Sequence, residues 1–372
     1  MNESLMIGLT QVDVRAVVDT YDLKPYYYPT LFPLKETYKL TFTTLESQVG
    51  LKIAADLVAR GATIPRKVRD AIQKIAGSIP KIAISRELEE DELTEYDIAV
   101  AMFSQNRDMK AIIEFWANDT EYCWNGVAAK IEWMALRQMS LGGLMMNQEV
   151  SQGVGQAIPL DYEIPDTQKL GAKTIWDGTD ADVIGDFKDA IKKGKGKGYN
   201  YKFAFMNPNT LGKLVKQEQI IKGAASYISN LTGVSQEPDL GGVNSYFGKA
   251  VGLNGVQIVI IDQDITIEDK NGDRVTGNPF EDDVIMFSES KVLGRTLWKK
   301  PIDLNLKNSK ALKVSREHTV IKKWSEEEPI KEVTQGIANA FPVWDLAVRS
   351  TLLQVNSKSW NKSIVDQVLP LG

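Results

Sequence analysis

The pattern of hydrophobic and polar residues near the N-terminus predicts an extended arm. Residues 11–34 begin with a short amphipathic pattern of valines and pass into residues 25–33, here called the aromatic segment. Three prolines in these nine residues exclude a helix or a central strand. Because so many aromatic side chains are poorly suited to water, we expect the segment to lie along another surface, its own or a neighbour's.

A strand and a long β excursion are predicted next. Tyr38, Leu40 and Phe42 alternate with polar residues, which is typical of a strand with one buried face, starting at position 36 or 37. From residue 51 to residue 85 the apolar positions are dispersed among basic residues and turn signals. This composition is too charged for a core and favours a long two-stranded excursion.

Helical spacing dominates the following region. Between residues 97 and 139 apolar positions recur at intervals of three, four or seven, which places them on one face of one or two consecutive helices. If there are two helices, the break is expected near Asn118-Asp119-Thr120, where Asp or Thr could cap a restart. The helical pattern stops after Gly142-Gly143.

An α/β block and a β tail complete the chain. Helices are predicted at 182–192 and 209–227, and strands at 201–206, 256–261 and 283–287, with a hairpin turn at 269–273. The tail has β patterns at 312–324 and 341–346 on either side of a turn at 325–329. We expect the two tail segments to pair with one another.

Composition limits the classes of function. The chain has 372 residues, of which 43% are hydrophobic, enough for one large or two ordinary domains. Its formal net charge of -5 gives no global positive field, so any DNA contact must be local and weak. A single cysteine excludes an intrachain disulfide, and we find neither a signal peptide nor a membrane-length apolar run. We therefore expect a soluble protein made in the cytoplasm.

Single residues offer little support for catalysis. His318 is the only histidine, and a surface role is favoured over a general base, which needs positioned partners. Cys123 lies on the apolar face of the predicted helix, where a cysteine behaves as a small hydrophobe.

Three charged motifs also fail as ligand sites. The segment Gly194-Lys195-Gly196-Lys197-Gly198 follows a helix and precedes a strand, the reverse of a phosphate loop, so a flexible basic loop is favoured over contact with nucleic acid. The acidic residues of 262–273 lack the glycine position of a calcium loop and suit a hairpin turn. The acidic runs 89–92 and 326–328 are interpreted as solvated surface at element junctions.

The order of these features resembles the Hong Kong 97-type capsid fold, particularly the phage lambda major capsid protein group. The resemblance covers nearly the whole chain. Five motifs carry it: Tyr28-Pro29-Thr30-Leu31-Phe32-Pro33 before a strand, the long helix of 97–139, the strand and Asn207-Pro208 helix start at 203–215, the hairpin at 264–276 followed by Asn278-Pro279-Phe280 and a strand ending at Phe287, and Lys323-Trp324-Ser325-Glu326-Glu327-Glu328-Pro329 before the β return at 341–344.

This resemblance implies an α+β fold with a division of labour along the chain. The expected parts are an N-terminal arm (1–35), a peripheral-domain strand (36–46), an extended loop (47–95), a peripheral domain with a spine helix (96–149), an axial domain (150–310) and a C-terminal β return to the peripheral domain (311–372). Some relatives form a covalent cross-link between a lysine and an asparagine, but no residue here matches that chemistry.

The implied function is structural. Subunits would self-assemble through hexamers and pentamers into an icosahedral or prolate head shell that encloses the double-stranded DNA of a tailed phage. Portal, scaffolding and decoration proteins would be further partners, DNA contact would be weak and non-specific, and no cofactor, metal or membrane is implied. The shell would be assembled in the host cytoplasm and become the virion capsid.

Candidate interface residues come from the two segments that we expect to need a neighbour. They are aromatic residues of the arm and basic residues of the extended loop: Tyr26, Tyr27, Tyr28, Phe32, Arg60, Arg66, Lys67 and Arg69. Deletion of residues 1–34 is expected to block shell formation and to leave a folded subunit. Two alternatives stay open: a nanocompartment shell of the same fold that encloses protein cargo, and an α/β enzyme with a carboxylate site in residues 182–287.

Overall fold

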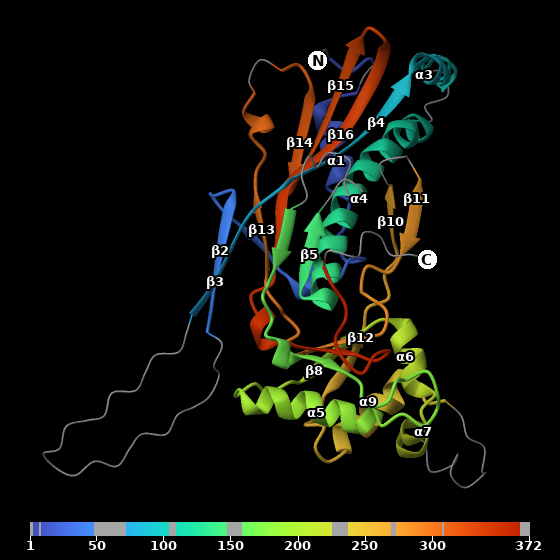
Figure 1. The fold of residues 1–372 in the computed structure, drawn as a ribbon. Helices are drawn as coiled ribbons and strands as arrows, with labels where there is room; N and C mark the ends of the chain where they lie inside the picture. Colours follow the sequence, from blue (N-terminus) through green and yellow to red (C-terminus); the bar gives the residue numbers. More distant parts are fainter. Residues whose placement is uncertain are drawn as a thin grey trace, which may run out of the picture. The chain divides into compact units, whose positions relative to one another are not determined.

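The structure is a computed structural model that describes residues 3–6, 9–47, 72–103, 109–146, 158–224, 237–268, 273–306 and 309–364 (Figure 1). The chain divides into two units. Unit one comprises Met1–Phe42, Gly77–Met134 and Arg295–Val343, and unit two comprises Thr43–Ala76, Ala135–Gly294 and Trp344–Gly372. Each unit is therefore built from segments that are distant in sequence.

A six-stranded sheet forms the framework of unit one. Its central strand is β16 (Ile330–Val343), which pairs with β15 (Thr319–Glu327) in an antiparallel hairpin. Successive parts of β16 also pair antiparallel with β4 (Lys81–Glu89) and β13 (Arg295–Lys299). The sheet is completed by β14 (Leu312–Arg316) beside β15 and by β1 (Leu34–Glu36), which runs parallel to β13.

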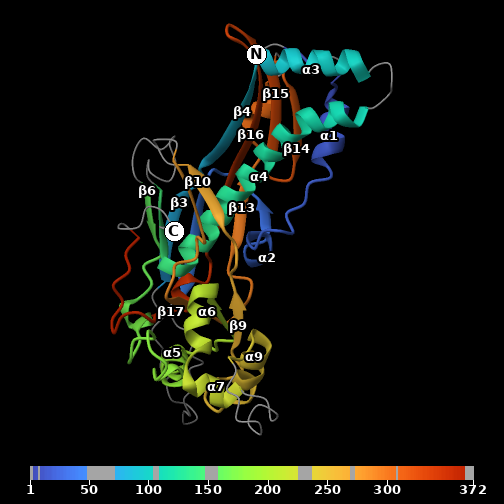
Figure 2. The same cartoon turned by 90° about the vertical axis from the view of Figure 1, so that its right-hand side faces the viewer.

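Helices pack on this sheet. Figures 1 and 2 show α4 (Met109–Leu141) running along the strands, while α3 (Glu90–Phe103) follows β4 directly. The short α1 (Gln11–Val18) begins with a capping box, in which the Thr10 hydroxyl accepts from the Asp13 N–H and the Asp13 carboxylate accepts from the Thr10 N–H. The shared core contains Val14, Val18, Leu88, Leu93, Tyr96, Trp116, Cys123, Trp124, Val314 and Ile321.

Two glycines let α4 approach the sheet closely. A Cβ atom on Gly336 of β16 would stand 2.5 Å from the carbonyl oxygen of Cys123. On the helix side, a Cβ on Gly126 would stand 2.6 Å from Cδ1 of Ile84 in β4. Gly336 therefore needs a residue without a side chain, because the obstacle is backbone in a closely packed interior, whereas a side chain at Gly126 would require only the end of the Ile84 side chain to move.

Unit two contains a five-stranded mixed sheet in the order β7 (Lys169–Gly171), β17 (Thr351–Gln354), β12 (Val284–Ser288), β8 (Phe203–Met206) and β9 (Gln257–Ile260). Its helices are α5 (Val183–Gly196), α6 (Pro208–Val215), α7 (Glu218–Ala224) and α9 (Leu240–Lys249). Side chains of Asp182, Asn207 and Asp239 cap α5, α6 and α9.

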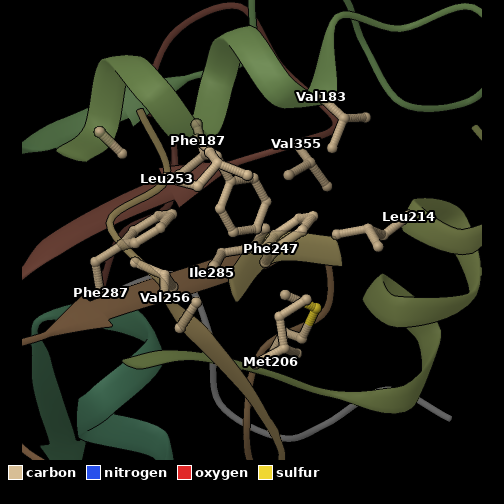
Figure 3. Close-up of a cluster of buried hydrophobic side chains, with 14 of the residues drawn as sticks. Val183, Phe187, Met206, Leu214, Phe247, Leu253, Val256, Ile285, Phe287 and Val355 are labelled. Carbon is tan, nitrogen blue, oxygen red and sulfur yellow. The ribbon is translucent and has the colours of Figure 1, made fainter. Parts of the chain in front are cut away.

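The core of unit two is aromatic at its centre. Phe187 of α5 lies edge-on to Phe247 of α9 and to Phe287 of β12, with ring centroids 5.0 Å and 5.2 Å apart (Figure 3). Aliphatic residues of the strands and helices surround these rings. Such burial is the main favourable contribution to folding.

Three two-stranded sheets complete the fold. They are β2 (Thr41–Ser47) with β3 (Ile72–Ser78), β5 (Gly143–Met146) with β6 (Ile158–Asp161), and β10 (Ile265–Glu268) with β11 (Arg274–Gly277). Short 3-10 helices lie at Asp166–Gln168, Ile302–Asn305 and Ala347–Arg349.

Most of the later elements were predicted correctly. The helix at 182–192, the strands at 201–206, 256–261 and 283–287, and the strands of the 264–276 hairpin are confirmed by α5, β8, β9, β12, β10 and β11. The predicted pairing of the two tail segments was wrong: β15 pairs with residues 330–338 of β16, and residues 341–343 at the end of β16 pair with β13. The predicted helix 209–227 is divided into α6 and α7.

The strand predicted around Phe42 is present as β2, but its predicted start at position 36 or 37 was wrong. β1 ends at Glu36, which pairs with Trp298 near the end of β13. The next strand, β2, begins only at Thr41. Tyr38 is 93% exposed and Leu40 is 46% exposed, whereas Phe42 is buried and stacks on Phe341. Alternation alone did not reveal which of these residues face solvent.

Helix boundaries also differ from the prediction in two places. The prolines of the aromatic segment do not exclude a helix, because α2 (Tyr28–Leu31) forms one turn with Pro29 in its first turn, where no N–H is needed. The break expected near residues 118–120 was wrong, since α4 is continuous there and the Thr120 hydroxyl donates back to the Trp116 carbonyl.

Part of the expected extended loop belongs to the sheet. Residues 81–89 of the predicted 47–95 loop form β4, whose nine residues all pair with β16. Residues 48–71, which include Arg60, Arg66, Lys67 and Arg69, lie outside the described residues.

Replacement of Gly336 by alanine tests the close approach of α4. The added methyl group collides with the backbone of Cys123, so we expect Gly336→Ala to lower the free energy of unfolding by about 1–3 kcal/mol. Gly212→Ala in α6 is the matched control, because nothing lies within 4 Å of that site and alanine favours a helix by up to about 1 kcal/mol. Urea unfolding measures both changes, and equal effects at the two positions would contradict the packing argument.

Candidate assembly site

The aromatic segment is anchored to α4 by one buried carboxylate. Glu132 accepts two backbone hydrogen bonds, from the Tyr27 N–H at 2.8 Å to Oε1 and from the Tyr28 N–H at 2.7 Å to Oε2. These N–H groups lie at the start of α2, where a helix leaves donors without intrahelical partners. At the other end of the segment, the Phe32 carbonyl accepts from the backbone N–H and the hydroxyl of Thr296 in β13. Unit one therefore holds both ends of the segment.

Two of the four aromatic interface candidates are core residues. Tyr28 and Phe32 are fully buried in the chain's own unit one, so neither side chain offers surface to a neighbour. The prediction that the arm could not bury itself within one subunit was wrong for these residues. Tyr26 and Tyr27 are half-buried, with the Tyr26 hydroxyl 3.4 Å from Asn125 Oδ1, and their contact with a neighbour stays a prediction.

The expectation that deletion of residues 1–34 leaves a folded subunit also needs correction. Val14 and Val18 of α1 belong to the same core cluster as Trp116 and Trp124 of α4. Tyr28, which follows them in the sequence, is buried as well. Removal of these residues would expose apolar core surface. The deletion is therefore a poor test of assembly, because it would also destabilise unit one.

His318 is buried, so its assignment to the surface was wrong. It follows Glu317, whose φ of 49° turns the chain sharply between β14 and β15. The turn directs the imidazole inward, where its Nε2 lies 3.2 Å from the Tyr28 hydroxyl and its ring lies beside Trp124. Among the described residues its Nδ1 has no hydrogen-bond partner, which gives no positioned partner for a general base.

Burial moves the pKa values of these two groups in opposite directions. Desolvation raises the pKa of Glu132 to about 7, although its two backbone hydrogen bonds act to lower it. Desolvation lowers the pKa of His318 to about 4. Near neutral pH, α2 is therefore contacted by a carboxyl group close to its titration point and by a neutral imidazole.

Exposed apolar side chains lie next to the end of β13. Lys299, the last residue of β13, donates from Nζ to the carbonyl of the exposed Tyr38, and the Leu40 carbonyl accepts from the Ile79 N–H. Ile302 and Leu306 follow β13 and are exposed as well. Sequence reasoning missed this feature, because it assigned Tyr38 and Leu40 to a buried strand face. Exposed apolar groups of this kind are suited to contacts between subunits.

The other sequence candidates occupy structural positions. Cys123 is fully buried, as expected for a small hydrophobe; burial raises the pKa of its thiol to about 11, and the thiol donates to the Thr334 carbonyl. The prediction of a flexible loop at residues 194–198 was wrong, because residues 194–196 belong to the last turn of α5 and Lys197 is its C-cap. The acidic runs lie where β4 meets α3 and where β15 meets β16.

Two further searches covered the described part of the chain. No group of three or more His, Cys, Asp or Glu residues there is arranged to hold a metal ion. None of the helices in those residues is long and apolar enough to cross a membrane.

The opposed pKa values predict opposed pH dependences in two variants. Glu132 has a folded-state pKa above its ordinary 4.5, so its contribution to stability is complete below pH 4.5 and is lost as the pH rises towards 7. Between pH 4.5 and 8 the parent protein therefore loses stability that Glu132→Gln does not lose. We expect the free energy of unfolding of Glu132→Gln to rise by about 3 kcal/mol relative to that of the parent protein over this range.

His318 has a folded-state pKa below 6.5, so its contribution to stability is lost as the pH falls from 6.5 to 4. We expect the free energy of unfolding of His318→Gln to rise by a similar amount relative to that of the parent protein on acidification.

Urea unfolding at pH 4.5, 6 and 8 measures both differences. Tyr28→Phe is the control, since it removes the hydroxyl near His318 without removing either titrating group. If the free energies of unfolding of the two variants differed from that of the parent protein by the same amount at every pH, neither group would be desolvated as described.

Comparison with known proteins places the chain in a family. The family described as phage major capsid protein E matches residues 13–347. A comparison with curated proteins found no match. Three solved structures share the fold: a protein of Escherichia coli CFT073 described as a prophage capsid protein (13% identity, 93% of this chain, 99% of that chain, TM-score 0.56), a phage-related protein of Bordetella bronchiseptica RB50 (10%, 92%, 96%, 0.52), and the capsid asymmetric unit of cyanophage A-1(L) (10%, 91%, 94%, 0.53).

These likenesses confirm the α+β, Hong Kong 97-type fold that the order of sequence motifs indicated. The family match extends from α1 to the 3-10 helix after β16 and so includes segments of both units. It therefore covers most of the chain, and the chain belongs to the phage major capsid protein E family of shell-forming capsid proteins.

Proposed function

We propose that this capsid protein assembles through hexamers and pentamers into a closed icosahedral or prolate head shell that encloses the double-stranded DNA genome of a tailed phage. The family match over residues 13–347 is the observation that carries the proposal. Assembly would take place in the host cytoplasm, without a cofactor or enzymatic activity, and with portal and scaffolding proteins and a decoration protein as further partners.

The expected domain division is part of this proposal, with changes at its boundaries. Residues 81–89 pair with β16, so the extended loop would end before β4 and not at residue 95. The axial domain would end at residue 294 and not at 310, because β13 belongs to the sheet of unit one, which would form the peripheral domain. Residues 344–372 of the expected C-terminal return fall in unit two, where β17 joins the five-stranded sheet.

Closed shells need heterologous contacts that repeat around rings and between them. Obligate interfaces of this kind bury about 2,000 Å² or more and are rich in apolar groups. Tyr38, Leu40, Ile302 and Leu306 supply exposed apolar groups beside β13, and the half-buried Tyr26 and Tyr27 supply aromatic surface. Basic residues of the loop, Arg60, Arg66, Lys67 and Arg69, would add charged contacts.

The alternatives are weaker on the same observations. A nanocompartment shell would share the fold, but the family match is to phage capsid proteins. An α/β enzyme would need a constellation of reactive groups in residues 182–287, where the core is apolar and aromatic. Electron microscopy that showed only monomers or dimers of the purified protein would favour the enzyme and contradict the proposed assembly.

Removal of the exposed apolar groups beside β13 should impair assembly. We expect the parent protein to form shells, or rings of five or six subunits, and Tyr38→Ser with Leu40→Ser to form few or none, because these groups would lose their contact with a neighbour. Electron microscopy measures assembly, and circular dichroism checks the fold. Tyr38→Phe is the matched control and should assemble normally, since it keeps the ring. Normal shells from the double serine variant would exclude these residues from the interface.

Charge reversal in the loop should give a salt-dependent defect. We expect Arg66→Glu, Lys67→Glu and Arg69→Glu together to weaken subunit association more at low than at high ionic strength, because salt screens exposed charge pairs. Light scattering over a series of salt concentrations measures the effect. A defect of the same size at every salt concentration would mean that charge is not the cause.

A further inference from the structure

Helix α5 has two chemically distinct sides. Val183 and Phe187 point from α5 into the core of unit two (Figure 3). Lys188, Lys192 and Lys195 are exposed and spaced by four and three residues, so they form one row on the side away from that core. This row is here called the lysine stripe.

The lysine stripe carries positive charge that the described residues do not neutralise. Within the described ranges, none of its three members makes an ion pair, and the Lys195 ammonium donates to the neutral Asn254 side chain at 2.8 Å. The nearby Asp189 of α5 is already paired with Lys173 at 2.8 Å. The exposed Lys193 adds a further positive charge beside the stripe.

The surface around the lysine stripe contains small residues and is open to solvent. The turn at residues 250–256 runs beside it, since a Cβ on Gly252 would stand 3.2 Å from Cε of Lys188. Nothing lies within 4 Å of where Cβ atoms would stand on Gly196 and Gly255. A hollow of about 390 Å³ is lined by Asp189, Lys192, Lys193 and Gly196. The stripe is therefore open beside Lys192 and Gly196, while Lys188 borders a second hollow that Gln219 and Tyr246 also line.

A purely structural role explains only part of this arrangement. Lysines in the last turn of a helix interact favourably with its dipole, and Lys193 and Lys195 occupy that turn of α5. Lys188 lies two turns earlier, and Lys192 precedes the last turn, so the dipole does not account for them. Their exposure without an ion pair suits an external anion.

We propose that the lysine stripe of α5 contacts the phosphate backbone of double-stranded DNA. Lys188 and Lys195 are separated by about 10 Å along the helix axis, at a rise of about 1.5 Å per residue. The contact is independent of base sequence, because ammonium groups reach phosphates and not base edges. It is also local, because the whole chain has a net charge of -5.

This inference rests on the proposed function, since a shell that encloses DNA would present an inner surface to it. The test compares the full-length protein with a variant in which Lys188, Lys192 and Lys195 are replaced by glutamine. Binding to a short DNA duplex is measured by fluorescence anisotropy over a series of salt concentrations. Loss of three phosphate contacts should make the dependence of log K on log salt shallower by about 2.7, at about 0.9 for each contact.

Two control variants separate charge on the stripe from charge in general. Replacement of the three lysines by arginine should keep the salt dependence of the parent protein. Glutamine at Lys216, Lys291 and Lys358, which are exposed in the same unit but lie outside α5, should leave it unchanged as well.

The outcomes distinguish this inference from the proposed function. An unchanged salt dependence in the stripe variant, or an equal loss in the second glutamine variant, overturns the inference while shells seen by electron microscopy still support the function. DNA binding like that of the parent protein together with a loss of assembly would assign the stripe to a protein contact and also overturns the inference. Absence of shells from the parent protein would count against the function alone, because DNA binding is measured without them.

Discussion

The close approach of α4 to β16 is the constraint on which unit one depends. Gly336 leaves no room for a side chain next to the backbone of Cys123, so helix and sheet lie in direct contact. This contact brings the apolar face of α4 onto the sheet, where Trp116 and Trp124 join residues of α1, α3 and β14. Because each of these segments comes from a different part of the chain, one helix-to-sheet contact organises the whole unit.

The same helix also fixes the aromatic segment. Glu132 satisfies the two N–H groups at the start of α2, but a buried carboxylate is costly, and the pKa of about 7 expresses that cost. His318 contacts the same turn through Tyr28 as a neutral group. The aromatic segment, which we expected to contact a neighbouring subunit, is thus held by its own subunit at Tyr28 and Phe32. Only the half-buried Tyr26 and Tyr27 offer aromatic surface to another subunit among these four residues.

Sequence patterns predicted the elements of unit two better than those of unit one. Local signals specified unit two: Asn207-Pro208 starts α6 as expected, α5 begins within one residue of its predicted start, and short apolar runs form β8, β9 and β12. In unit one the outcome depended on distant partners. Tyr38 alternates like a strand residue but is exposed because β1 ends, and His318 follows charged residues but is buried by a turn at Glu317. Periodicity reports the local backbone, and it does not report which distant surface covers a side chain.

A protein that must associate at chosen surfaces also has to block others. The outer strand β9 of the unit-two sheet would offer free backbone groups to another chain, but the Asn244 side chain of α9 occupies them: its amide donates to the Ile258 carbonyl and its oxygen accepts from the Ile258 N–H. At β7, the Ala172 N–H continues the ladder towards β17 by donating to the Gln354 carbonyl, and it also donates to the Ser357 carbonyl. The edge of β9 is therefore blocked at Ile258, whereas the exposed side chains of Tyr38 and Leu40 could pack only on a surface that matches them.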